Sequence, residues 1–178
     1  MKQLRMLTHL PEDVAYDQMA SPVGTLTLIA NSQGLHAVLW DIDYSHLPYK
    51  KIINQFSYSQ NNNIIIETKK QLTEYFDHKR KTFDLPLAIN GTDFQIQAWE
   101  QLRKIPYATT ISYAEQAARM GNKNKARAAG MANGRNPISI IIPCHRVIGA
   151  NGDLVGFGGG IDKKAYLLNL ENQKESLK

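Results

Sequence analysis

The segment 142–147, which reads Ile-Pro-Cys-His-Arg-Val, holds the residues of this chain best suited to covalent chemistry. Cys144 is the single cysteine of the sequence, and His145 follows it directly. A thiolate is a strong nucleophile, and an imidazole can accept the proton that the thiol must lose. Most free cysteines are instead small buried apolar residues, so the pair by itself indicates only a candidate nucleophile.

A third group is needed to orient the imidazole, as in any triad. The acidic residues that could do this near the C-terminus are Asp153, Asp162 and Glu171, and their spacing does not select one. Adjacent side chains in a strand point to opposite faces, so Cys144 and His145 touch only if the chain turns here. Otherwise a bridging water is the natural link between them.

The first half of the chain has the pattern of a small α/β domain. Apolar runs over 21–30 and 35–40 flank the turn 31–34 and predict a β-hairpin. Apolar residues at helical spacing over 68–79 predict an amphipathic helix, and 83–87 is read as one more strand. We therefore expect an antiparallel sheet flanked by a helix.

The second half is expected to be mostly helical. Thr92 is a suitable N-cap for a helix over 93–104. Ser112-x-x-Glu115 is a capping-box pattern that opens a short helix to about Met120. The stretch 123–132, rich in Ala, Lys and Arg, predicts a second helix after a glycine-containing turn. This arrangement is typical of a helix-turn-helix.

The boundary between the two halves is placed at Asn90-Gly91, which gives two expected domains, 1–90 and 91–178. Within the second, 138–142 reads as a buried strand that leads to Cys144. Asp162 is expected to cap a final helix that runs through Glu171.

Charge is distributed unevenly over the chain. Residues 1–94 hold nine Lys/Arg and ten Asp/Glu, whereas residues 95–178 hold twelve and six. A basic face favours a polyanion such as DNA, because lysine and arginine displace the counterions of phosphates. The stretch 119–135 contains no acid and five basic residues, namely Arg119, Lys123, Lys125, Arg127 and Arg135.

The composition argues against several other classes of protein. The five histidines are scattered and not at metal-ligand spacing, so no metal and no cofactor are expected. One cysteine cannot form an intrachain disulfide, which fits a reducing compartment. No apolar run approaches the roughly 20 residues of a membrane span, and we expect a cytoplasmic protein without a membrane partner.

Five blocks of sequence, in order, resemble the O6-alkylguanine-DNA alkyltransferases, also called methylated-DNA–protein-cysteine methyltransferases. The active-site block is Asn136-Pro137-x5-Pro143-Cys144-His145-Arg146-Val147. The others are Ser21-Pro-Val-Gly-Thr-Leu, Phe94-Gln-x3-Trp99 through Ser112-Tyr113, Ala126-Arg127-Ala128-Ala129-Gly130, and Gly156-Phe157-Gly158-Gly159-Gly160 with Leu167-Leu168-x2-Glu171.

The resemblance implies a ribonuclease-H-like N-terminal domain and a winged helix-turn-helix C-terminal domain. It implies that an alkyl group passes irreversibly from O6-alkylguanine in DNA, with O4-alkylthymine as a further candidate, to Cys144 of a monomer. His145 would act as base through a water, and Glu171 would orient His145. Tyr113 would contact a backbone phosphate and donate a proton toward the leaving guanine.

The resemblance also implies a DNA-binding surface and a base pocket. Arg127 would fill the gap left by a flipped nucleotide, with further DNA contacts from Tyr113, Ala126, Lys125 and Arg135. Asn136 would brace the active-site turn, while the pocket would be formed by Val147, Phe157 and Gly158. The sequence departs from the family at Ala108 and Ala114, where glycine is common, and at Phe157-Gly158.

Four rival classes are disfavoured by the same residues. A structural helix-turn-helix protein with an inert buried cysteine leaves the set from Asn136 to Glu171 unexplained. A non-catalytic lesion-binding relative lacks the cysteine that stands here at 144. A regulator of the adaptive response needs a cysteine-rich zinc domain, which one cysteine cannot supply. A Cys–His hydrolase would need an oxyanion hole, and no signature of one is present.

Overall fold

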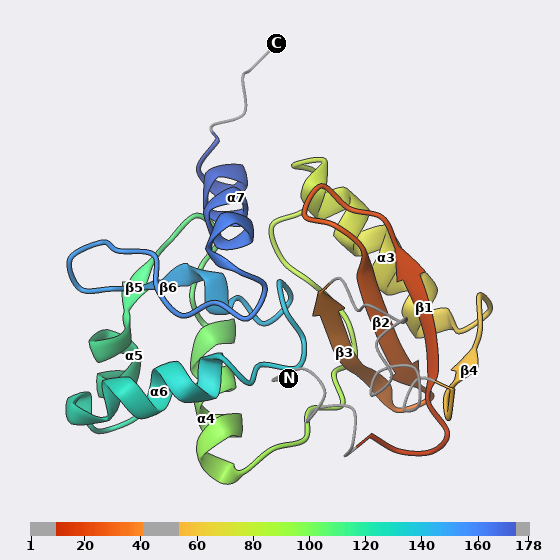
Figure 1. Cartoon of the computed structure of the whole chain (residues 1–178), viewed down its shortest axis with the longest axis horizontal. Coiled ribbons are helices and arrows are strands. Elements are labelled where there is room, and N and C mark those ends of the chain that lie inside the picture. The colour runs from red at the N-terminus through yellow and green to blue at the C-terminus, as the bar shows by residue number, and fades with distance from the viewer. Residues whose placement is uncertain (1–9, 41–53, 174–178) are drawn as a thin grey trace. The chain divides into compact units, whose positions relative to one another are not determined.

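The computed structural model describes residues 10–40 and 54–173. Contacts divide the chain into two compact units, whose elements are labelled in Figure 1. The first unit holds the described residues up to Asn90 together with Pro137–Ser139. The second holds Gly91–Asn136 and the described residues from Ile140 on.

The first unit is built on a sheet with the strand order β3-β2-β1-β4. The predicted hairpin is confirmed as β2 (Leu26–Asn31) paired antiparallel with β3 (Gly34–Trp40). β1 (Ala15–Met19) is also antiparallel to β2, and β4 (Ser57–Tyr58) joins β1 in parallel, so the sheet is mixed. The residues 21–24, expected as strand, form a turn that connects β1 to β2.

Both faces of this sheet are covered. Helix α3 (Asn63–Phe76) packs against β1, β2 and β3 and buries Ile65, Leu72 and Tyr75. It begins five residues earlier than predicted, because the Asn62 side chain accepts hydrogen bonds from the backbone N–H groups of the first turn. Apolar residues of the other face form a cluster of Val14, Ile29, Ala37 and Leu39, with Leu10, Tyr16 and Phe56 packed against it.

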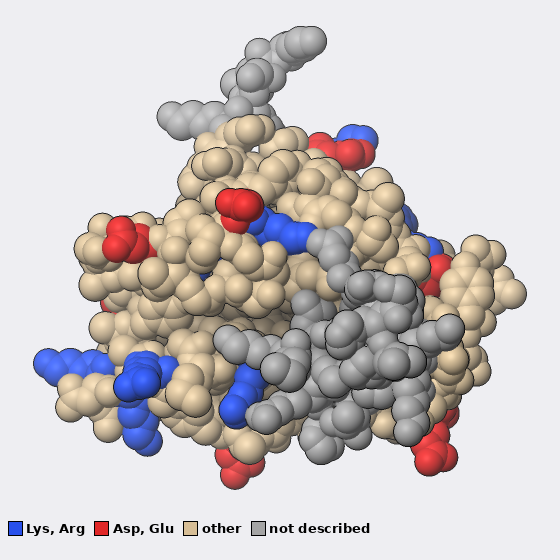
Figure 2. Space-filling model, viewed as in Figure 1, with Lys and Arg blue, Asp and Glu red and all other residues tan. Residues whose placement is uncertain are grey.

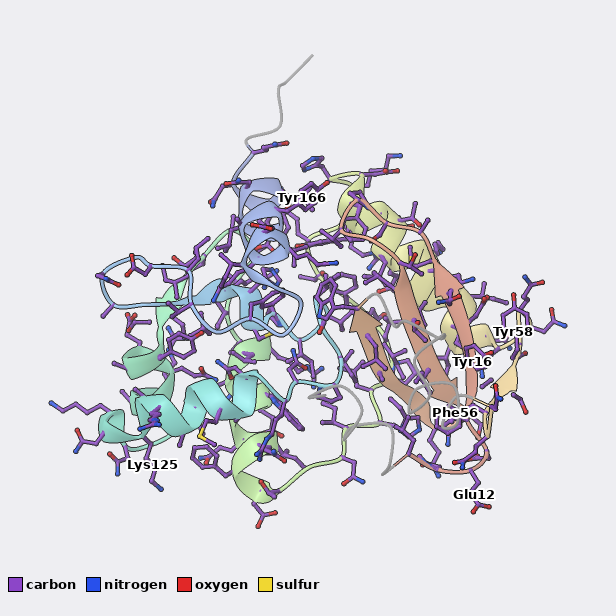
Figure 3. All side chains as sticks on the ribbon, in the orientation of Figure 1. Glu12, Tyr16, Phe56, Tyr58, Lys125 and Tyr166 are labelled. Carbon is purple, nitrogen blue, oxygen red and sulfur yellow. The ribbon has the colours of Figure 1, made fainter. Side chains whose placement is uncertain are left out.

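One edge of the sheet is aromatic. Tyr16 of β1 and Tyr58 of the edge strand β4 meet edge to face with their ring centroids 5.6 Å apart, and both are labelled in Figure 3. β1 was not predicted, since Ala15–Met19 is polar and mixed in character. Its position between two strands is decided by pairing with residues distant in sequence.

The strand expected over 83–87 is absent, and this prediction was wrong. Leu87 forms only an isolated bridge with Leu35, whose N–H donates to Pro86 O at 2.8 Å. Pro86 has no N–H with which to continue a ladder, so the segment runs beside β3 without forming a strand.

The second unit is mostly helical, as predicted. Its elements are α4 (Asp93–Arg103), β5 (Ile111–Ser112), α5 (Tyr113–Arg119), η1 (Lys123–Lys125), α6 (Ala126–Asn133), η2 (Cys144–Arg146), β6 (Val147–Ile148) and α7 (Ile161–Asn172). β5 and β6 form a short parallel pair. No helix among residues 10–40 and 54–173 is long and apolar enough to cross a membrane.

The predicted N-cap Thr92 of α4 and the predicted capping box at Ser112 of α5 are confirmed, and Thr92 also forms a capping box with Gln95. Gly121, with φ 92°, follows α5 and allows the turn into η1 and α6. The helix predicted over 123–132 therefore begins as one turn of 3-10 helix. The helix-turn-helix is thus confirmed in α5 and α6, which pack against each other.

A buried polar network fixes the interface between these helices. Gln116 of α5 and Asn133 of α6 exchange two side-chain hydrogen bonds, at 2.7 and 3.0 Å. Gln116 also donates to Ala98 O of α4 at 3.2 Å, and Trp99 of α4 donates from Nε1 to Ala132 O at 3.0 Å. Because these bonds link α4, α5 and α6 pairwise, they fix the three helices relative to one another.

Two local predictions in the second half were wrong. The run 138–142 is buried but is not a strand, because the chain turns at Ile140, which has φ 72°. A left-handed β-branched residue is strained, so the surrounding structure imposes this turn. The N-cap of α7 is Gly160 with φ 96°, and no side chain caps this helix; Asp162 lies in its first turn instead.

Candidate active site

The Cys144 thiol lies at the start of a tight turn and not in a strand. Pro143 has φ −83° and ψ 65°, and Cys144 N donates to Ile142 O at 2.8 Å, which together describe an inverse γ-turn. The 3-10 turn Cys144–Arg146 follows and ends as Val147 N donates to Cys144 O. Proline suits this position because its φ is already fixed near the required value.

The side chain of Asn136 stabilises this turn by hydrogen bonds. Its Nδ2 donates to Ile142 O at 2.7 Å and to the sulfur of Cys144 at 3.2 Å. An N–H directed at sulfur favours the charged thiolate over the thiol. The Cys144 side chain is nevertheless buried, and burial raises its pKa, which the Asn136 hydrogen bond and the charge of Lys164 oppose only in part. The resting side chain is therefore a thiol.

His145 is fully buried and is fixed by a carboxylate. Its Nε2 lies 2.7 Å from Oε1 of Glu171, so of the three acids considered above the structure brings Glu171 to the imidazole. Burial, together with the charges of Arg146 and Lys164, lowers the pKa of His145 more than Glu171 raises it, so the ring is neutral at pH 7. A neutral ring that donates from Nε2 carries its lone pair on Nδ1, and Nδ1 is buried without a hydrogen-bond partner in the described structure.

Glu171 accepts hydrogen bonds from three N–H groups of two further residues besides the imidazole ring. Arg146 donates to its Oε2 from Nε at 2.9 Å and to its Oε1 from Nη2 at 3.0 Å, and the backbone N–H of Ala108 donates to Oε2 at 3.1 Å. Burial alone would raise the pKa of Glu171, but His145 and Arg146 together outweigh it and hold the pKa at about 2. The carboxylate therefore stays ionised.

Tyr113, the first residue of α5, lies close to the loop 153–160. Its hydroxyl donates to Val155 O at 2.8 Å. Burial, with a smaller effect of Cys144, raises the pKa of Tyr113 to about 12, so its hydroxyl keeps its proton at neutral pH. Gly156 has φ 65°, and a Cβ there would lie 3.3 Å from the tyrosine oxygen, which favours glycine next to this contact.

The basic residues gather over the helix-turn-helix. In Figure 2 the Lys and Arg side chains form a blue area at the lower left of the view, where α5 and α6 lie in Figure 1. Arg127 and Arg135 are exposed, and Ala126 is half-buried at the start of α6. Lys125 is exposed, and its ammonium lies 5.7 Å from the centre of the Phe94 ring (Figure 3).

The remaining expected pocket residues differ in their environment. Val147 is buried at the end of the Cys144 turn, Phe157 is half-buried, and Gly158 is exposed. A Cβ built on Gly158 meets no atom within 4 Å, so local packing does not require glycine there. Within residues 10–40 and 54–173, no group of three or more His, Cys, Asp or Glu is placed to hold a metal ion.

Two family models match this chain, one in each half. Residues 14–89 match the 6-O-methylguanine DNA methyltransferase, ribonuclease-like domain, and residues 93–173 match the DNA binding domain of the same family. A methylated-DNA–protein-cysteine methyltransferase of Methanosarcina acetivorans is 44% identical over 156 residues, which cover 88% of this chain and 97% of the relative. The chain belongs to the 6-O-methylguanine DNA methyltransferase family.

Other family members agree with this assignment. A relative of the same name from Mycobacterium tuberculosis is 40% identical over 161 residues, covering 90% of this chain and 94% of the relative. The crystal structure of M. tuberculosis OGT in complex with DNA matches with a TM-score of 0.78 and 40% identity, covering 88% of this chain and 92% of that one. The two-part fold expected from the sequence is thereby confirmed.

Two buried basic residues, Arg146 and Lys164, belong to this site but received no role from the sequence. Arg146 stands inside the cysteine motif, directly after His145. Lys164 could have been found by its spacing, because Leu167, Leu168 and Glu171 follow it at i+3, i+4 and i+7. A charged residue on the buried stripe of a helix is a signal for a functional role.

The two departures from the family glycines have different consequences. Ala114 lies within α5 and is exposed, where alanine is favourable. Ala108 has φ 56°, a left-handed conformation that is strained for alanine, and it directs its N–H at Glu171. The glycine common in the family would adopt this φ without strain.

We therefore expect Ala108→Gly to stabilise the protein by up to about 1 kcal/mol, because relief of the left-handed strain exceeds the entropy gained by the unfolded chain. Urea denaturation measures the change. The exposed helical Ala118→Gly is the control and should cost about 1 kcal/mol. Equal losses in the two variants would mean that Ala108 is not strained.

Proposed function

We propose that this protein repairs DNA by transferring the alkyl group of O6-alkylguanine to the sulfur of Cys144. The observation that carries the proposal is the arrangement around the thiol. Asn136 donates to the sulfur, and His145 is held by Glu171 in the tautomer that leaves Nδ1 free to accept a proton. Membership of the 6-O-methylguanine DNA methyltransferase family supports the choice of substrate.

The chemistry is a substitution at the alkyl carbon. The sulfur forms a bond to that carbon while the bond from carbon to guanine O6 breaks, and the thiol proton moves through a water to Nδ1 of His145. A proton delivered to the departing guanine balances the reaction, and Tyr113, whose hydroxyl stays protonated, is the proposed donor. No cofactor is consumed. The thioether product is stable, so each molecule reacts once.

DNA must be opened for this reaction, because O6 lies inside the base stack. A flipped nucleotide costs a few kcal/mol, and a side chain inserted in its place recovers part of that cost. Arg127 is exposed on α6 between the small residues Ala126 and Ala128, which allow close approach of the helix to a groove. We propose Arg127 for this role, with Lys125 and Arg135 as contacts to phosphates.

The direct test is the mass of the intact protein after incubation with a duplex that contains one O6-methylguanine. We expect a gain of one methyl group, located on Cys144 by peptide mapping, that saturates at one per protein. No gain with retained lesion binding would assign the protein to a non-catalytic, lesion-binding class. We further propose that the protein acts as a monomer in the cytoplasm, where a free thiol persists.

Arg127→Ala is expected to slow repair of the duplex about 10- to 100-fold, because stacking of one side chain against bases contributes about 1–3 kcal/mol. The reaction with free O6-benzylguanine should change little, since no base has to be flipped. Single-turnover rates on the two substrates measure this. Arg119→Ala removes an exposed charge from the same basic stretch and should affect the duplex reaction less. Equal losses on both substrates would rule out the proposed role of Arg127.

A further inference from the structure

Lys164 of α7 is a lysine with none of its surface exposed. Its Nζ donates to Val147 O at 2.6 Å and to Val155 O at 2.9 Å, and it lies 5.7 Å from the centre of the Tyr113 ring. One ammonium therefore connects α7, the end of the cysteine turn, the loop 153–160 and α5. Burial of a lysine is costly unless the surrounding structure uses its charge.

The charges of this region do not balance in the thiol state. Glu171 is matched by Arg146, which contacts both carboxylate oxygens. No Asp or Glu among residues 10–40 and 54–173 forms an ion pair with Lys164. The buried charges are thus Arg146, Glu171 and Lys164, with one positive charge in excess. A thiolate at Cys144 would neutralise it.

The position of Lys164 allows its ammonium to pair with a thiolate at Cys144. Its acceptor Val147 is the residue whose N–H closes the turn on Cys144 O, so the ammonium is anchored to the segment that carries the thiol. Burial is the main effect on both groups: it lowers the pKa of Lys164 and raises that of Cys144. The charge of each group opposes the shift of the other. The other titratable or charged groups around them are Tyr113 from α5, His145 and Arg146 from η2, and Glu171 from α7.

We propose that Lys164 is the counter-charge of the Cys144 thiolate and, through its bonds to Val147 and Val155, a positioning residue for the closing loop. Its consequence for alkyl transfer rests on the function proposed above. Lys164 keeps its proton throughout the reaction. Asn136 supplies a hydrogen bond to the sulfur, whereas Lys164 supplies a full positive charge. This charge stabilises the buried thiolate that forms when the thiol loses its proton at neutral pH.

The test uses iodoacetamide, which alkylates a thiolate without DNA, and the single cysteine makes the mass readout unambiguous. The rate is followed against pH for the wild type, Lys164→Met and Lys164→Arg. We expect Lys164→Met to react at least about tenfold more slowly at neutral pH and to titrate about one pH unit higher or more. Lys164→Arg, which keeps the charge, should stay within about threefold of the wild type.

Lys163→Met is the matched control, since it removes the same charge one residue earlier from a half-buried position, and it should titrate as the wild type does. If Lys164→Met does not fold, Lys164→Gln replaces it, because an amide can donate to a carbonyl without charge. A neutral variant that folds and titrates like the wild type overturns the proposal. If neither neutral variant folds, Lys164→Arg decides: an unchanged titration supports the proposal, and a shift of one pH unit overturns it.

A parallel measurement with O6-benzylguanine separates this inference from the proposed function. Transfer from the free base should fall in Lys164→Met by the same factor as alkylation by iodoacetamide. If the wild type fails to react with O6-alkylguanine at all, the proposed function fails. The thiol titration still decides whether Lys164 is the counter-charge.

Discussion

Cys144→Ser is expected to abolish alkyl transfer, with a loss of at least about a thousandfold, because a serine hydroxyl gives up its proton far less readily than a thiol. Serine is close to cysteine in size, so the turn at 144–146 and its Asn136 contact can persist. The measurement is intact-protein mass after incubation with an O6-methylguanine duplex. The wild type should gain one methyl group and the variant none.

The same variant should still bind DNA, since the basic residues over α5 and α6 are untouched. Affinity for the lesion duplex at a fixed salt concentration, measured by fluorescence anisotropy, should lie within a few-fold of the wild type. Methyl transfer that persisted in Cys144→Ser would place the acceptor on another residue. Loss of both transfer and binding would instead indicate a damaged fold, which circular dichroism would detect.

Glu171→Gln is expected to slow transfer by about 10²- to 10⁴-fold, in the range seen when the group that orients a catalytic histidine is neutralised. Two effects act together. A neutral amide no longer fixes the His145 tautomer, and Arg146 loses the carboxylate that balances its charge. Single-turnover rates against pH measure the change, and an unaltered pH–rate profile would exclude a role for Glu171 in the transfer reaction.

This variant should also lose stability, by about 3–5 kcal/mol, because an arginine is left buried without its partner. The pH dependence has a defined sign. The pKa of Glu171 is about 2 in the folded protein and about 4.3 in a free chain, so its contribution is fully present above about pH 4.3 and is lost as pH falls toward 2. In urea denaturation, the free energy of unfolding should decrease less from pH 7 to pH 3 for Glu171→Gln than for the wild type. Parallel curves would contradict the assignment.

Much of the chain could be predicted because its signals are local. An N-cap or a capping box needs only one or two residues close in sequence, so Thr92 and the pair Ser112–Glu115 identified the starts of α4 and α5. The hairpin of β2 and β3 follows from two apolar runs joined by a four-residue turn. The motif around Cys144 carried the family resemblance, which the comparisons confirmed. The roles of the individual site residues remain proposals for the experiments above.

Predictions failed where distant residues decide the conformation. The polar segment 15–19 became a strand through its partners, and Pro86 stopped 83–87 from becoming one. Ile140 adopts φ 72° within a run that reads as a strand. In each case pairing or packing with another part of the chain outweighs the local preference, because local preferences amount to about 1 kcal/mol or less per residue.

The sequence alone thus identified the candidate nucleophile, its neighbouring candidate base and the helix-turn-helix, since residue type and short spacing define them. Spacing left Asp153, Asp162 and Glu171 equivalent as partners of His145; the family resemblance pointed to Glu171, and the tertiary structure brings its carboxylate to the imidazole. The tertiary structure alone decided that Arg146 balances Glu171 and that Lys164 is buried without a carboxylate partner among residues 10–40 and 54–173. Charge balance in a region of low dielectric is a property of neighbours in space, and order along the chain does not encode it.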